Sequence, residues 1–178
     1  MSQDLIAYAE DLEALNAKWQ PLPWQVHPVQ ALFYHKVKDI GAQCGRSSGK
    51  TEMLSYCHWR YAREVPDSES YIFEPLQKQA REILWASKRI QNFGPTDFIQ
   101  SINNTEMRIT FKNGSFLKLD GSDNVDSLRG IKPKGLISYD ELKDHKQAFL
   151  DAMEPNRARY NAPALYLGTP PEIHNHYV

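Results

Sequence analysis

Long apolar runs and cysteine are both scarce in this sequence. No uninterrupted hydrophobic stretch approaches the roughly 20 residues that a membrane-spanning helix needs, so we expect no membrane contact. The two cysteines, Cys44 and Cys57, have a spacing that fits neither a metal-binding pair nor a disulfide framework. We expect both to be reduced thiols, with Cys57 in the core. The acidic N-terminus lacks the basic and apolar parts of a secretory signal, which favours the cytoplasm.

An excess of positive charge is missing as well. The chain carries 21 Lys and Arg residues against 22 Asp and Glu residues, a formal net charge of −1. Proteins that bind DNA through their overall charge usually have a basic excess, so any DNA contact must be local or supplied by a partner. The rest of the composition, 41% hydrophobic and 24% charged over 178 residues, is typical of a globular protein with one substantial core.

Hydrophobic periodicity predicts alternating helices and strands. We expect an N-terminal helix and linker (1–24) before a core (25–178). In the core we expect helices over 30–38, 51–63 and 77–90, and strands before residue 44 and over 70–75, 136–139 and 164–167. Alternating residues around Asn113-Gly114 predict a β-hairpin. This order favours an α/β fold, a mostly parallel sheet flanked by helices with an added antiparallel hairpin.

The segment CGRSSGKT (44–51), which we call the phosphate loop, is the clearest functional motif. It fits the phosphate-binding pattern G-x-x-x-x-G-K-[ST], except that Cys44 replaces the first glycine. Backbone N–H groups at a helix start bind phosphate oxygens, while Lys50 would reach the β- and γ-phosphates and Thr51 would ligate Mg²⁺. The candidate nucleotide-binding residues here are Gly45, Arg46, Ser47, Ser48, Gly49, Lys50 and Thr51. The alternative is a flexible Gly/Ser loop before a helix.

Two further motifs follow apolar strands. LISYDE (136–141) ends in adjacent carboxylates, which would be costly at a buried strand end unless a cation lies there. Asp140 would hold Mg²⁺ through its water shell and Glu141 would orient the attacking water; the alternative is a solvated strand end. ALYLGTPP (164–171) places Thr169 at the strand end where α/β sheets bind ligands, and it would sense the γ-phosphate unless it only forms a turn.

Taken in order, these motifs resemble the ATPase domain of the large terminase subunit, the motor that packages DNA into phage capsids. The segment 26–33 resembles its adenine-binding motif and 44–51 resembles its Walker A motif. The segments 73–85, 113–141 and 167–177 resemble, respectively, the strand and helix after Walker A, the hairpin leading to Walker B, and the coupling motif. The implied fold is a P-loop NTPase of the helicase-like ASCE branch.

The resemblance implies an ATP-hydrolysing, Mg²⁺-dependent motor domain that powers translocation of double-stranded DNA into a procapsid. Gln30 would read the adenine, and Thr169 would couple hydrolysis to movement. Arg46 in cis or Arg129 from a neighbouring subunit would stabilise the charge at the γ-phosphate, unless Arg129 forms a salt bridge with Asp123 or Asp126. The implied partners are double-stranded DNA, a portal protein, a small terminase subunit and further copies of the chain in a ring, in the host cell cytoplasm.

The sequence departs from the family at two points. Cys44 stands at the first glycine of the loop, and we expect it to contribute its backbone N–H and little else. The chain also ends just after the coupling motif, so we expect a truncated ATPase core without the nuclease domain. The alternatives are a related DNA helicase or translocase ATPase, and a fragment that binds nucleotide without turning it over.

Overall fold

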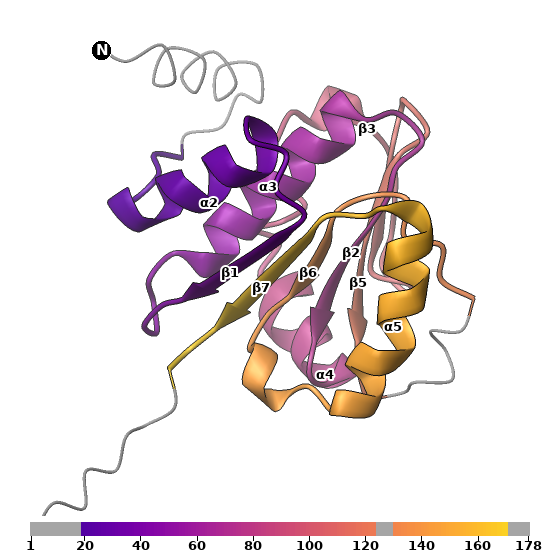
Figure 1. The fold of residues 1–178 in the computed structure, drawn as a ribbon. Helices are drawn as coiled ribbons and strands as arrows, with labels where there is room; N and C mark the ends of the chain where they lie inside the picture. The colour runs from indigo at the N-terminus through magenta and orange to yellow at the C-terminus, as the bar shows by residue number, and fades with distance from the viewer. Residues whose placement is uncertain (1–18, 124–129, 171–178) are drawn as a thin grey trace, which may run out of the picture.

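The computed structural model describes residues 19–123 and 130–170 (Figure 1). Most of the N-terminal helix and linker expected over 1–24 falls outside these residues. No helix within the described part of the chain is long and apolar enough to cross a bilayer. The division at residue 24 stays a prediction.

A single seven-stranded sheet organises the described chain, with the order β1-β7-β6-β2-β5-β4-β3. The first five strands in this order are parallel, whereas β4 and β3 continue the sheet in antiparallel fashion. Because β7 pairs with both β1 and β6, it separates the strand before the phosphate loop from the strand before the two carboxylates. The strands are β1 Asp39–Gln43, β2 Glu69–Glu74, β3 Ile99–Asn103, β4 Arg108–Phe111, β5 Phe116–Gly121, β6 Ile137–Tyr139 and β7 Ala164–Gly168.

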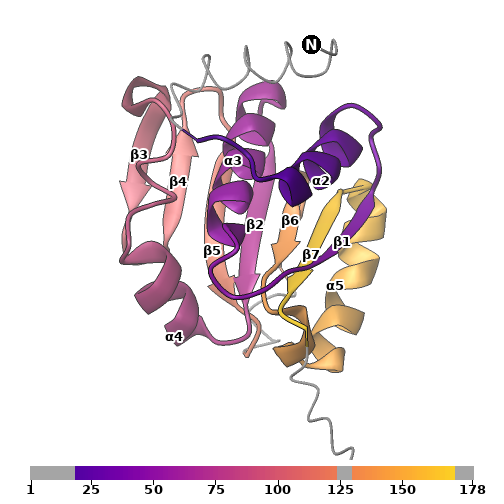
Figure 2. The same ribbon diagram turned by 90° about the vertical axis from the view of Figure 1, so that its left-hand side faces the viewer.

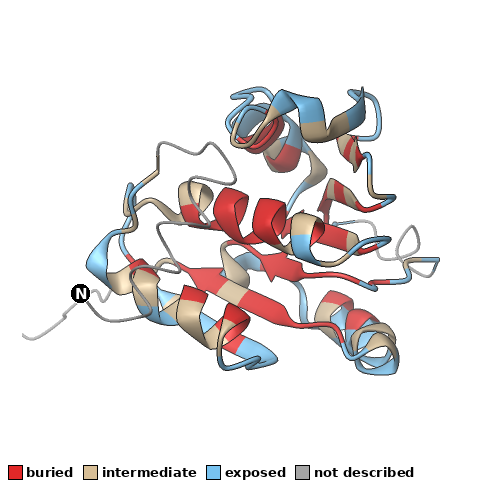
Figure 3. Ribbon diagram, turned by 90° about the horizontal axis from the view of Figure 1, so that it is seen from above, coloured by how far each residue is buried: buried red, intermediate tan, exposed pale blue. Residues whose placement is uncertain are grey.

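Helices cover both faces of the sheet. Helices α2 and α3 lie on one face and α5 lies on the other, as the two views in Figures 1 and 2 show. Buried residues concentrate in the central strands between these layers (Figure 3). The helical segments are α2 Pro23–Phe33, α3 Lys50–Glu64, α4 Gln77–Gln79, the π-helix η1 Ala80–Trp85, the 3₁₀ turns η2 Thr96–Phe98 and η4 Leu142–Asp144, and α5 Gln147–Tyr160.

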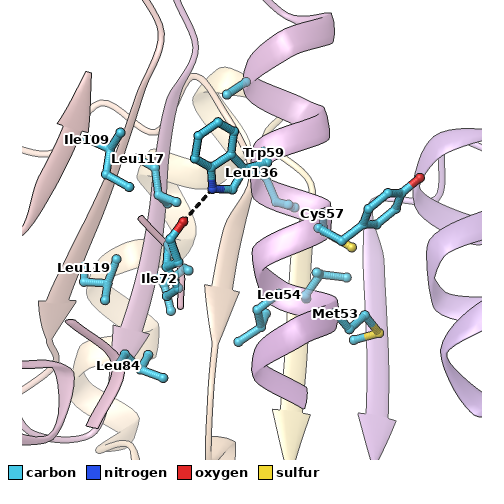
Figure 4. Packing of buried hydrophobic residues seen from close by; sticks show 14 of the residues in the cluster. Met53, Leu54, Cys57, Trp59, Ile72, Leu84, Ile109, Leu117, Leu119 and Leu136 are labelled. Carbon is cyan, nitrogen blue, oxygen red and sulfur yellow. Dashed lines mark hydrogen bonds between the residues drawn. The ribbon is translucent and has the colours of Figure 1, made fainter. Parts of the chain in front are cut away.

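Helix α3 supplies much of the larger core. Trp59 is fully buried, its ring lies 5.0 Å from that of Phe111, and its indole N–H donates to the Ile90 carbonyl at 2.7 Å (Figure 4). Cys57 lies on the same helix without solvent exposure, and burial raises the pKa of its thiol to about 12. The predictions of a buried Cys57 and of two free thiols are therefore confirmed.

A second core lies under α5. Phe149 and Met153 of this helix are fully buried, and the Phe149 ring contacts Phe73 at 5.1 Å and Tyr139 at 5.9 Å. Since Phe73 and Tyr139 belong to the neighbouring strands β2 and β6, this packing fixes the two strand ends that carry Glu74 and Asp140.

The sequence predictions need four corrections. The helix expected over 30–38 instead runs from Pro23 to Phe33. Proline is tolerated at this start because the N–H groups of the first helical turn have no partner inside the helix, so the missing N–H of Pro23 costs no hydrogen bond. The helix expected to reach residue 90 ends at Trp85 and is mostly a π-helix. Neither α5 nor the edge strand β3 was predicted. The mixed sheet, the hairpin of β4 and β5, and the helix after the phosphate loop are confirmed.

Candidate active site

The phosphate loop connects β1 to α3 and lines a cavity of about 330 Å³. Helix α3 begins at Lys50, directly after Gly49, whose φ of 82° is a left-handed value that glycine adopts without strain. The start of this 15-residue helix presents unbonded N–H groups and a partial positive charge, which favour bound phosphate. Thr51 also lines the cavity, so loop and helix start can hold an anion together.

Two side chains from α2 hold the loop from outside. The indole of Trp24 donates to the Ser48 carbonyl at 3.0 Å, and the amide of Gln25 donates to the Gly49 carbonyl at 2.8 Å. Gln25 is fully buried and its carbonyl oxygen accepts the N–H of Leu22 at 2.7 Å, so its amide is fixed at both ends. A Cβ on Gly49 would lie 2.8 Å from the Gln25 amide nitrogen, so another residue there would displace the Gln25 amide as well as strain the left-handed backbone.

No sequence motif pointed to Trp24 and Gln25 as supports of the loop. Gln30, which we predicted to read adenine, lies further along α2 and is partly buried. Among the described residues its side chain makes no hydrogen bond to the phosphate loop, and its role stays a prediction. The signal that could have identified Trp24 and Gln25 is Pro23, which is typical of a first helical position and would place both residues in the first turn of α2.

Lys50, Glu141 and Thr169 meet where strands β6 and β7 end. The Lys50 ammonium lies 3.2 Å from Glu141 Oε1 and donates to Thr169 Oγ1 at 3.0 Å. The Thr169 hydroxyl donates to Glu141 Oε1 at 3.0 Å, and the Thr169 backbone N–H donates to Oε2 at 3.3 Å. Three residues that lie far apart in the sequence thus form a closed triangle, as expected if all three act on one substrate.

Glu141 is held in an unusual state. Its φ of 49° is left-handed, which costs a non-glycine residue roughly 1 kcal/mol or more. Burial acts to raise its pKa, but the hydrogen bonds from Thr169 and Lys50 and the charge of Lys50 outweigh burial, so the pKa lies below its usual value. The carboxylate is therefore ionised at neutral pH, with both oxygens occupied.

Asp140 is fixed through its backbone as well as its side chain. Its N–H donates to the Phe73 carbonyl at 3.0 Å, and its carbonyl accepts from His145 Nε2 at 2.7 Å. The other imidazole nitrogen of His145 lies 2.8 Å from Ser122 Oγ, which ties the end of β6 to the end of β5. Burial raises the pKa of Asp140 to about 6, while the Glu141 N–H and Lys50 lower it.

These oxygen donors fit a magnesium ion. Asp140 is 6% exposed, and Thr51, whose side chain carries a hydroxyl, lines the phosphate cavity. Within the described ranges no group of three or more His, Cys, Asp or Glu side chains converges to hold a metal without other ligands. Magnesium commonly takes one or two protein oxygens and completes its shell with phosphate and water, which matches this donor set.

The arginines occupy different positions. Arg46 is exposed in the phosphate loop, and Arg129 lies outside the described residues. Arg89, which no sequence motif indicated, lines the phosphate cavity and pairs with Glu52 at 2.9 Å. Cys44 is buried and its N–H donates to the Gly168 carbonyl at 3.0 Å, which attaches the start of the loop to β7.

Comparison with solved structures relates this fold to the ATPase domains of large terminases. No family model and no curated protein matches the chain. The ATPase domain of the Thermus phage P74-26 large terminase superimposes with a TM-score of 0.67 at 21% identity, over 90% of this chain and 68% of that one. The large terminase of another thermophilic bacteriophage gives a TM-score of 0.64 at 16% identity, covering 84% of this chain and 39% of its own.

A helicase shares the same architecture. The UvsW helicase of bacteriophage T4 matches 90% of this chain with a TM-score of 0.54 at 11% identity. At such identities the matches establish the fold: a P-loop NTPase fold like that of large terminase ATPase domains. The family resemblance seen in the sequence is confirmed at that level.

Proposed function

We propose that this chain is an ATP-hydrolysing motor domain of the large terminase type, which powers the translocation of double-stranded DNA into a procapsid. The observation that carries the proposal is the meeting of Lys50, Glu141 and Thr169 beside the phosphate loop. The lysine suits a γ-phosphate, the carboxylate suits a water, and the hydroxyl lies between them. The terminase fold of the neighbours supports the choice of motor.

Nucleotide binding would rearrange the triangle. ATP would place its phosphates on residues 45–51, with Gln30 at the adenine and Thr51 and Asp140 as the protein ligands of Mg²⁺. When bound, the metal would neutralise charge on the β- and γ-phosphates. Because the Lys50 ammonium is needed at the phosphates, it must turn away from Glu141. The Glu141 carboxylate would then be free to accept a hydrogen bond from water.

Hydrolysis would proceed by attack of that water on the γ-phosphorus. Glu141 would orient the water and accept its proton as the bond to ADP breaks, and Arg46 or a neighbouring subunit's Arg129 would stabilise the charge that develops. Thr169 contacts Glu141 through both its hydroxyl and its N–H, so a change at the phosphate would reach the chain after β7 directly. This contact is a physical basis for coupling hydrolysis to movement.

The proposed setting is a packaging complex in the host cell cytoplasm. Its other members would be double-stranded DNA, a portal protein, a small terminase subunit and further copies of this chain in a ring. A net charge of −1 gives the chain little nonspecific attraction to DNA, so we expect the assembled complex to supply the grip.

The test is phosphate release from ATP and Mg²⁺ by the wild type and by Glu141→Gln, first alone and then with portal protein and DNA. We expect release that depends on Glu141 and increases in the complex. Release that is equal in both proteins would refute the proposed role of Glu141, and no nucleotide binding by the wild type would refute the motor proposal.

A second candidate function is nucleotide binding without turnover by the isolated chain. The closed triangle favours it, because both oxygens of Glu141 are occupied. Tight binding of ATP with no phosphate release under any of these conditions would select this function. DNA unwinding by the chain would instead select a helicase, as the UvsW likeness allows.

A further inference from the structure

Glu74 is a buried carboxylate that the site described above does not use. It is the last residue of β2, and the pairing of Phe73 with Tyr139 brings it beside Asp140 at the end of β6. Only 5% of the residue is exposed. Its backbone is fixed as well, because its carbonyl accepts the N–H of Ser122 at 2.9 Å.

The Glu74 side chain has no partner within residues 19–123 and 130–170: none of the hydrogen bonds or ion pairs there involves its carboxylate. The charges that act on it belong to the hydrolytic site. Burial, followed by the carboxylates of Asp140 and Glu141, raises its pKa to about 8, and the charge of Lys50 offsets this only in part. Three carboxylates therefore share one ammonium group.

Such an arrangement is costly unless another cation joins it. Ionising a buried carboxylate without a partner is unfavourable, which is why the pKa of Glu74 rises, whereas a glutamine of the same shape would carry no charge at all. A glutamate that served only to pack at the end of β2 would gain nothing from its charge. The position of the charge beside Asp140 thus points to a function in cation binding.

We propose that Glu74 is a further positioning residue of the hydrolytic site, whose carboxylate accepts hydrogen bonds from water ligands of the Mg²⁺ held by Thr51 and Asp140. The inference rests on the proposed function, since it needs a bound nucleotide and metal. Glu74 need not bind the metal directly. Among the described residues, the carboxylates of Glu74, Asp140 and Glu141 do not converge as metal ligands, and magnesium retains several waters that need hydrogen-bond acceptors.

The experiment measures the affinity for ATPγS in Mg²⁺ and again in EDTA, and takes the ratio as the contribution of the metal. Four proteins are compared: the wild type, Glu74→Gln, Asp140→Asn as a reference for a lost ligand, and Glu69→Gln as a control. Glu69 lies at the other end of β2, where it pairs with Lys134 at 3.1 Å, so its substitution removes the same charge away from the site.

We expect Glu74→Gln to lower the enhancement by Mg²⁺ about tenfold, the scale on which outer-shell partners of a metal act. Affinity in EDTA should stay nearly the same, because the proposed role of Glu74 acts only through the water ligands of the metal. A purely structural defect would instead weaken binding in both conditions. Thermal unfolding should show Glu74→Gln to be at least as stable as the wild type.

Two results would overturn the inference while leaving the proposed function in place: an enhancement in Glu74→Gln equal to that of the wild type, or an equal loss of affinity with and without Mg²⁺. In both cases Asp140→Asn would still lose the enhancement. If the wild type itself bound no ATPγS, or showed no enhancement by Mg²⁺, the proposed function would fail first.

Discussion

The phosphate loop is fixed by neutral hydrogen bonds from outside it, whereas the residues that follow β6 and β7 are fixed by their own charged and polar side chains. Trp24 and Gln25 hold the loop through backbone carbonyls, and the cavity side is left open for a ligand. At the strand ends, Glu141 and Thr169 are bonded to each other and to Lys50, so these polar groups are already satisfied by one another.

Under the proposed function, this difference predicts that binding and turnover depend on different residues. A loop held through carbonyls keeps its shape when a phosphate arrives, because none of its supports competes for the ligand. A charged triangle must open, since the Lys50 ammonium cannot serve Glu141 and a γ-phosphate fully at once. We therefore expect loop supports to control affinity and strand-end residues to control rate.

The largest effect should come from Glu141→Gln. We expect the maximal rate of phosphate release to fall by about 100-fold or more, because general-base assistance contributes on the order of 10² to 10⁴. Affinity for ATP should be unchanged or higher, since glutamine competes less for Lys50. Steady-state kinetics together with equilibrium binding would measure both. Equal losses of rate and affinity would contradict the expectation that the strand-end residues control the rate and the loop supports control the affinity.

The contact between α3 and β6 should be sensitive to acid. His58 of α3 is fully buried, with Nε2 2.8 Å from Ser138 Oγ of β6, and burial lowers the pKa of this imidazole to about 3. The unfolded chain binds a proton below about pH 6.5 and the folded chain does not, so stability is full above pH 6.5 and falls as the pH drops towards 3. By pH 5 this one group should cost about 2 kcal/mol.

Urea unfolding at pH 7.5 and pH 5 checks this expectation. His58→Gln should lose this part of the pH dependence, whereas His27→Gln, at an exposed position of α2, should retain it. If both variants lost stability between the two pH values as the wild type does, the acid sensitivity would originate elsewhere.

The strand-end half of the site was largely predictable from the sequence. Asp140, Glu141 and Thr169 each follow a short apolar strand, and a parallel sheet brings such strand ends to the edge where the loop after β1 carries Lys50. An apolar run followed by a polar residue is visible in the sequence itself, so it can be recognised without the tertiary structure. The strand order β1-β7-β6 could be known only from the fold. This order puts Thr169 between Lys50 and Glu141.

The supports of the loop and the third carboxylate were not predictable in this way. Trp24 and Gln25 act on backbone carbonyls 24 residues away, and such contacts leave no trace in residue type. Glu74 looks like any polar residue before a proline until β2 pairs with β6. Strand β3 was missed because four of its five residues are exposed, which removes the apolar alternation that marks a strand.

Loss of a loop support should have an intermediate effect. We expect Gln25→Ala to weaken ATPγS binding about tenfold, since it removes a buried hydrogen bond and leaves the Gly49 carbonyl without a partner. The rate at saturating ATP should stay near that of the wild type.

Gln30→Ala is the matched control on the same helix. If Gln30 reads adenine, this substitution should reduce the preference for ATP over GTP, whereas Gln25→Ala should weaken both nucleotides alike. A loss of the ATP preference in Gln25→Ala and not in Gln30→Ala would reassign adenine reading to Gln25.

The smallest effect should come from Arg89→Gln at the rim of the phosphate cavity. Arg89 pairs with Glu52, but 66% of its side chain is exposed, and such a pair contributes less than about 1 kcal/mol. We expect ATPγS affinity to change about threefold or less in the monomer, with Lys88→Gln as a control for lost charge next to it. A loss of about 100-fold in Arg89→Gln alone would place the guanidinium on the phosphates, and the loop would then depend on a charged support that must change partners, as Glu141 does.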